Sequence, residues 1–179
     1  MGGRLEISEA RITYRAQEQL AGVNFPNDAV GSSPTVTGTL VIAKDGTIDS
    51  TQSKLTVDLR TFKSDQDMRD NYLRTRTFEV EKFPFAEFVP KRATGLPHPL
   101  PSAGAAGIQL TGDMTIHGTT SELTWTLYAT FSPAVVAGRG KTTFTFDKFG
   151  LPKPQLARLL SVDDKVELEI EFRTKRTLL

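Results

Sequence analysis

The side chains best suited to hold a ligand in this sequence are aromatic. Phenylalanine occurs 11 times, against one tryptophan and three tyrosines, so most of the rings carry no polar atom. The candidates are Phe78, Phe83, Phe85, Phe88, Trp125, Phe131, Phe144, Phe146 and Phe149. Rings of this kind line cavities for apolar molecules, whose burial contributes about 25 cal/mol per Å². The alternative interpretation is that they only fill an ordinary core.

A second candidate group is polar and lies in one short segment. It consists of Arg69, Asp70, Tyr72, Arg74 and Arg76. A tyrosine hydroxyl and an arginine at the mouth of a cavity can bind a carbonyl or a phosphate, the polar end of an otherwise apolar ligand. The alternative is that the arginines and the aspartate pair with one another and hold a helix in place.

The sequence offers few residues for catalysis or metal binding. It has no cysteine, which excludes disulfides, thiol catalysis and cysteine-ligated metals. The two histidines, His98 and His117, lie in separate turn regions without a metal-ligand spacing. Gly-x-Ser-x-Gly and glycine-rich phosphate motifs are missing. The row Glu167, Glu169 and Glu171 is typical of a solvated strand face rather than of a catalytic carboxylate pair. We therefore predict no catalytic residue and no bound metal.

Length and charge restrict the class of protein. The 179 residues suit a single domain, 1–179, whose core is large enough to enclose a cavity. The net charge of +1 argues against a nucleic-acid partner, because phosphate binding needs a concentrated basic surface. No apolar run approaches the roughly 20 residues of a transmembrane helix. No secretion leader is visible, and Met1, Gly2 and Gly3 are consistent with an added start that replaced a leader.

Most of the sequence alternates between apolar and polar residues with a period of two, which predicts strands with one buried face. In the last strand, Val166, Leu168, Ile170 and Phe172 point one way and the glutamates point the other. Eight such runs lie near 5–18, 34–43, 52–61, 84–93, 107–117, 121–132, 139–149 and 163–174. The sequence therefore predicts an all-β fold, a single eight-stranded antiparallel barrel around one small ligand. The segment from Asn24 to Pro34 is expected to be a loop.

One or two short helices interrupt the strands. The first is predicted from Ser64 to about Thr75, with Ser64 as N-cap and Asp67 completing a capping box. Asp65 and Arg69 have the spacing of a favourable helical ion pair.

This helix is too short to be stable alone, so Met68, Tyr72 and Leu73 are expected to pack against the barrel. A second helix is expected from Gln155 to Leu160.

Four stretches follow one another in the order of a known family. They are Ser53 to Phe62, Asp67 to Pro84 (DMRDNYLRTRTFEVEKFP), Leu110 to Thr120 (LTGDMTIHGTT) and Phe149-Gly150-Leu151. The second resembles an Arg-Asp-x-His-Leu-Arg run that leads to Phe-Phe and then an aromatic-Pro pair. The third resembles Gly-x-Leu-Thr-Ile-x-Gly-Val-Thr, and the fourth is similar to Asp-Phe-Gly-Leu. Together they cover most of 34–174 and resemble the YceI-like family.

The resemblance implies a lipocalin-like barrel that binds a polyprenyl lipid or an isoprenoid quinone along its axis and requires no cofactor. It also implies a periplasmic or secreted protein, while a cytoplasmic location stays open. The chain departs from the family at Tyr72, which replaces His, at Thr77, which replaces Phe, and at Phe146-Asp147-Lys148, which replaces Arg-x-Asp. The lost His and the lost Arg leave fewer polar groups for a ligand head, while the added Phe makes the cavity more apolar.

We expect the ligand to contact Arg69, Tyr72, Leu73, Phe78, Phe83, Phe85, Phe88, Met114, Trp125, Phe144, Phe146 and Phe149. The function expected first is carriage, storage or protection of this ligand by a protein that is not an enzyme. Two alternatives stay open: a barrel enzyme that isomerises, cyclises or hydrolyses an apolar substrate, and an interaction module with a filled core. A buried pair such as Tyr72 with Asp70 would favour the enzyme. A homodimer also stays open.

Overall fold

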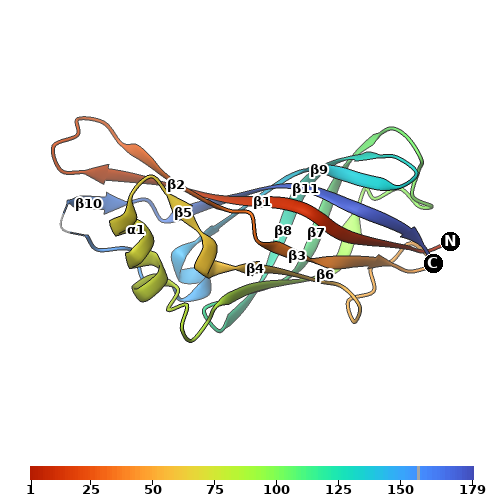
Figure 1. The fold of residues 1–179 in the computed structure, drawn as a ribbon, viewed down its shortest axis with the longest axis horizontal. Helices are drawn as coiled ribbons and strands as arrows, with labels where there is room; N and C mark the ends of the chain where they lie inside the picture. Colours follow the sequence, from red (N-terminus) through yellow and green to blue (C-terminus); the bar gives the residue numbers. More distant parts are fainter. Residues whose placement is uncertain (157) are drawn as a thin grey trace.

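The computed structural model describes residues 1–156 and 158–179, which form one antiparallel sheet that closes on itself. Eight strands make the ring, in chain order: β1 (Gly3–Leu20), β3 (Val36–Ile42), β4 (Lys54–Asp58), β6 (Phe85–Thr94), β7 (Ala105–Ile116), β8 (Thr119–Phe131), β9 (Val135–Thr145) and β11 (Lys165–Leu178). The last strand, β11, pairs with β1 and closes the ring. Figure 1 shows an elongated body with both termini at one end.

Three further strands lengthen the ring at the end opposite to the termini. β2 (Asn27–Ser33) and β10 (Leu159–Val162) both pair with the outer part of β1, and β5 (Lys63–Ser64) pairs with β2. Along one edge, β1 changes partner between Glu6 and Ile12, from β3 to β2. The ring is therefore an irregular barrel rather than a perfect one.

The predicted all-β fold and its ring of eight strands are confirmed, since each ring strand coincides with one alternating run. β11 illustrates the reason. Val166 and Leu168 are buried inside the ring, whereas Glu167 and Glu169 lie outside and meet Lys141 of β9 at 3.5 and 3.4 Å. An apolar face that alternates with a charged one is stable only as a strand with one side in the core.

Two sequence predictions are wrong at the end opposite to the termini. The segment from Asn24 to Pro34, expected to be a loop, contains β2, whose polar and glycine-containing sequence lacks alternation. The segment from Gln155 to Leu160, expected to be a helix, enters β10 at Leu159, while residue 157 lies outside the described residues. In both places pairing with the long β1 determines the conformation.

The helix predicted after β5 is present. α1 (Asp67–Tyr72) continues into a π-helical turn, η2 (Leu73–Thr77), and lies across the end of the ring (Figure 1). The predicted cap is wrong, because Gln66 precedes the first helical residue while Ser64 belongs to β5. The Ser64 hydroxyl instead donates to the Asp70 carboxylate at 2.6 Å.

The side of this helical segment that faces the ring is only partly as predicted. Leu73 is buried, and Tyr72 is half-buried. Met68 is 67% exposed, so the prediction that it packs against the barrel is wrong. The remaining helical pieces are short 3-10 turns, η1 (Leu59–Thr61) and η3 (Phe146–Phe149). No helix among the described residues is long and apolar enough to cross a membrane.

Candidate functional site

The interior of the ring contains two apolar cavities. The first, about 100 Å³, lies at the α1 end, and the second, about 120 Å³, lies toward the termini. Both have Ile12, Val57, Ala86 and Met114 in their walls, so the two meet at this belt of four side chains. Each volume is many times the roughly 10–15 Å³ that one water molecule needs. The interior is therefore not a filled core.

Most of the residues predicted to contact a ligand lie in these walls. Arg69, Leu73, Phe78, Phe144 and Phe146 line the first cavity, Phe88 and Trp125 line the second, and Met114 lines both. In the second cavity the rings of Phe88 and Trp125 meet edge to face, with centroids 6.5 Å apart. These side chains come from α1, η2, η3, four ring strands and, for Phe78, the position directly after η2.

Four predicted residues lie outside the walls of both cavities. Phe85 is 45% exposed on the outer face of β6, where the Arg60 guanidinium covers its ring at 5.3 Å. Phe83 packs against the His117 ring, with centroids 4.8 Å apart. Neither ring reaches the interior, because Ala86 and Phe88 occupy the inward positions of the strand.

The other two are Tyr72 and Phe149. The Tyr72 hydroxyl accepts a hydrogen bond from the Gln155 backbone N–H at 3.1 Å, so Tyr72 fixes the segment before β10. Phe149 is fully buried behind Phe144, with ring centroids 5.0 Å apart, and supports the wall rather than lining it. Tyr72 and Asp70, the pair that would favour an enzyme, are not hydrogen-bonded to each other, and Asp70 accepts from Ser64 instead.

The first cavity has one polar end. Its polar lining residues are Tyr14, Glu18, Arg69 and Thr77. Sequence reasoning identified Arg69 and missed the other three. The period-two pattern of β1 contained a signal for two of them, because Tyr14 and Glu18 fall on the same face as the apolar Ile12. A tyrosine and a glutamate on an otherwise apolar strand face indicate polar groups inside a barrel.

Arg69 is the centre of an ionic cluster that is buried except for Asp65, whose side chain is 79% exposed. Its guanidinium donates to Glu18, to Asp65 at 2.9 Å and to the Ser64 hydroxyl at 3.2 Å. Burial lowers the pKa of Arg69, but the bonds to Asp65 and Glu18 outweigh burial and the pKa is raised. The Asp70 carboxylate, 4% exposed, accepts from the Ser64 backbone N–H at 3.0 Å. The cluster thus holds three carboxylates and one guanidinium.

Tyr14 is held rigidly beside this cluster. Its ring meets the Phe62 ring, with centroids 5.6 Å apart. On the other side it lies so close to β2 that a Cβ on Gly31 would be 2.4 Å from a ring carbon. Burial raises the pKa of Tyr14 to about 12, so the phenol is neutral under ordinary conditions.

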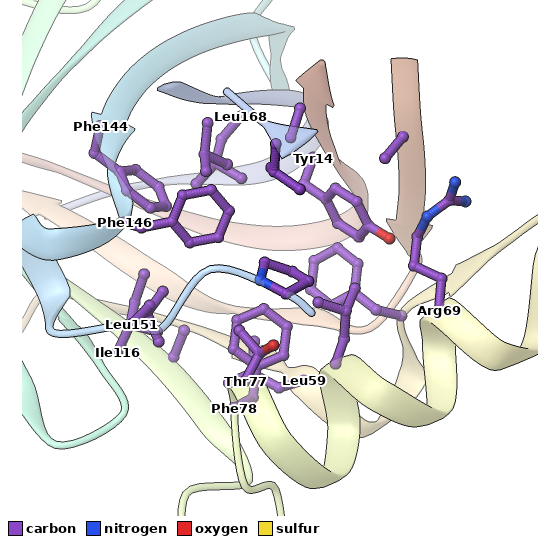
Figure 2. A pocket seen from close by; sticks show the side chains of 18 of the residues that line it. Tyr14, Leu59, Arg69, Thr77, Phe78, Ile116, Phe144, Phe146, Leu151 and Leu168 are labelled. Carbon is purple, nitrogen blue, oxygen red and sulfur yellow. The ribbon is translucent and has the colours of Figure 1, made fainter. Parts of the chain in front are cut away.

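Two hydroxyls of this cavity have no hydrogen-bond partner among the described residues. They are the buried Tyr14 Oη and Thr77 Oγ1. Figure 2 shows Tyr14 and Arg69 at one side of the pocket and Phe144 and Phe146 at the other.

Among the residues that the structure describes, no three His, Asp or Glu side chains are placed to hold a metal ion. The geometry suits a long apolar molecule with one polar end.

Residues 6–174 match the family model of the YceI-like domain. Among solved structures, a polyisoprenoid binding domain from Saccharophagus degradans, implicated in plant cell wall breakdown, is 12% identical, with a TM-score of 0.74 over 98% of each chain. BcnA from Burkholderia cenocepacia is 16% identical, with a TM-score of 0.68 over 92% of this chain and 95% of that chain. The Campylobacter jejuni YceI protein is 13% identical, with a TM-score of 0.59 over 83% and 85%. At these identities the likeness shows the fold. A comparison with curated proteins gives no significant match.

Proposed function

The chain belongs to the YceI-like family, and from this premise we propose that it binds an isoprenoid-type lipid or quinone lengthwise inside the ring. The observation that carries the proposal is the pair of apolar cavities that share a wall and have polar residues at one end. Such a ligand has the same division into a long apolar tail and a small polar head. Carriage, storage or protection of the ligand is the role we propose.

The orientation of the ligand follows from the distribution of polar side chains. The head lies in the first cavity, near Tyr14 and the Arg69–Glu18 pair, which are three of the four polar residues in its wall. The tail passes the belt at Ala86 and Met114 and enters the second cavity, which is lined almost wholly by apolar side chains. Burial of the tail supplies the affinity, at about 25 cal/mol per Å² of apolar surface.

We propose binding without chemistry, and therefore no cofactor. An enzyme of this shape would need a reactive polar group beside the tail. The polar residue in the second cavity wall is Thr174, whose hydroxyl donates to the Val136 carbonyl at 2.8 Å. Asp70 and Tyr72, the pair that would favour an enzyme, bond to Ser64 and Gln155 instead. A periplasmic or secreted location and a homodimer stay predictions.

The test is mass spectrometry of an organic extract of the protein, purified from a bacterial host without added ligand. We expect an isoprenoid lipid or quinone in a near-stoichiometric amount. The matched control is an unrelated apolar-core protein purified from the same host, which measures lipid carried over nonspecifically. An empty extract that stays empty after incubation with a panel of polyprenyl lipids and quinones would contradict the proposal.

A further inference from the structure

We propose that Tyr14 and Thr77 form a head-group site that selects an uncharged head with a carbonyl or hydroxyl oxygen and rejects a phosphate-bearing head. The proposal rests on the function proposed above, since it specifies which end of an isoprenoid ligand the first cavity accepts. It is carried by two unpartnered hydroxyls and by the charge of the cluster around Arg69.

The two hydroxyls are unusual for buried groups. Tyr14 is 9% exposed and Thr77 is 1% exposed, yet neither hydroxyl makes a hydrogen bond of normal geometry to the described residues. The Ser64 side chain lies near the Tyr14 hydroxyl, but its own hydroxyl proton goes to Asp70. Buried polar groups are nearly always paired, and an unpaired one costs free energy. Both residues lie in the wall of the first cavity. A ligand oxygen that accepts a hydrogen bond from either hydroxyl would remove part of this cost.

The Tyr14 hydroxyl is positioned before any ligand arrives. Tyr14 on β1 pairs with Gly31 on β2, and the phenol ring occupies the space where a side chain at position 31 would lie. Phe62 contacts the ring as well, at a centroid distance of 5.6 Å. A donor fixed in this way loses little conformational freedom on binding. The nearby Ser64 hydroxyl is already bonded to Asp70.

The cluster beside Tyr14 does not suit an anion. The Arg69 guanidinium, the obvious partner for a phosphate, is already bonded to Glu18 and Asp65. Glu18 is as buried as Arg69, and the buried Asp70 carboxylate is linked to Arg69 through the Ser64 hydroxyl, whereas Asp65 is 79% exposed. A phosphate placed there would meet two buried carboxylates against one guanidinium, which is a net negative environment. Like charges in a partly buried site repel strongly. A neutral oxygen needs only a hydroxyl donor.

The experiment compares ligands that share one tail and differ in the head. Affinities of the whole protein are measured for farnesylacetone, farnesol, farnesene and farnesyl diphosphate, which carry a ketone, a hydroxyl, no polar head and an anion. We expect farnesylacetone and farnesol to bind more tightly than farnesene, and farnesyl diphosphate to bind most weakly. Tyr14→Phe and Thr77→Val should each weaken farnesylacetone binding about three- to tenfold and leave farnesene binding unchanged.

Both substitutions keep the shape of the side chain, and circular dichroism verifies the fold. The matched controls are Tyr128→Phe and Thr143→Val, at exposed positions on the outer face of the ring, which should change no affinity. Tightest binding of farnesyl diphosphate, or unchanged ketone affinity in both variants, would overturn the head-group inference while leaving the proposed function intact. Failure of all four compounds to bind would contradict the proposed function itself.

Discussion

Arg69 on α1 and Glu18 on β1 form an ion pair in which each side chain is only 7% exposed. The two residues are 51 positions apart in the chain, and their pairing joins the helical segment to the long strand that runs past the ring. Because the pair lies in the wall of the first cavity, it fixes the shape of the end where we place the ligand head.

Removing one partner of this pair should destabilise the protein strongly. Glu18→Gln removes the buried carboxylate partner of Arg69 and leaves the exposed Asp65 to balance its charge, and loss of one partner of a buried pair costs about 3–5 kcal/mol. The control is Asp28→Asn, which breaks the exposed pair of Asp28 with Arg15, whose side chains are 49% and 40% exposed. Breaking it should cost less than about 1 kcal/mol. Urea unfolding of both variants measures the difference. Equal losses of unfolding free energy would show that the buried pair stabilises the protein no more than the exposed pair does.

The Tyr14 ring should be able to keep its position only while residue 31 has no side chain. In Gly31→Ala the new Cβ would lie 2.4 Å from the Tyr14 ring, and relieving such overpacking costs about 1–3 kcal/mol. Gly107→Ala is the control, because a Cβ at Gly107 meets nothing within 4 Å. In a Tyr14→Ala background the cost of Gly31→Ala should largely disappear, which a double-mutant cycle of unfolding free energies detects. Additive costs would mean that the ring does not occupy this space.

Alkaline pH should destabilise the protein through Tyr14. The pKa of Tyr14 rises from 10.0 to about 12 on burial, so above pH 10 the unfolded chain loses this proton while the folded chain keeps it. Stability therefore falls as pH rises from about 10 to 12, by at most about 2.7 kcal/mol. Tyr14→Phe should remove this part of the slope, and Tyr128→Phe, at a position 53% exposed, should not. Urea unfolding at several alkaline pH values gives the slopes. Identical slopes in both variants would contradict the assignment.

The belt between the cavities should control access to the second one. Ala86 is 5% exposed and lines both cavities, so the larger side chain of Ala86→Leu narrows the passage for a tail. We expect much less co-purified lipid, with a stability cost of about 1–3 kcal/mol. Ala105→Leu, at an exposed position on β7, should keep the wild-type lipid content. A folded Ala86→Leu protein with a full complement of lipid would place the tail elsewhere.

Trp125 should report how far a tail reaches. It is the single tryptophan and lines the second cavity, so its fluorescence depends on what fills that cavity. Geraniol is short enough to stay in the first cavity and should leave the emission unchanged, whereas the longer geranylgeraniol should shift it. Met114→Leu, a substitution of similar volume in the belt, should preserve both results. An equal response to both alcohols would contradict the head-to-tail orientation.

The sequence predicts the ring well because alternation is a local property of each strand. It did not separate the two faces of β6, since Phe85 and Phe88 are both aromatic. Phe85 faces outward because Ala86 and Phe88 take the inward positions of β6, and Arg60, on a different element, covers its ring. The polar end of the cavity depends on contacts across long distances in the chain. Tyr14 becomes a fixed donor only when β2 places Gly31 against its ring, and local sequence reasoning did not identify β2.

The pairing of β1 with β11 has a consequence for biosynthesis. Ser8 donates its hydroxyl to the Arg173 carbonyl across 165 positions of sequence, and the register of the two strands runs from Gly3 to Arg15. While the chain is being made, β1 exists long before its partner, and one of its edges stays open to other strands. Closure must therefore follow completion of β11, which makes premature aggregation of the nascent chain a hazard that a chaperone would relieve.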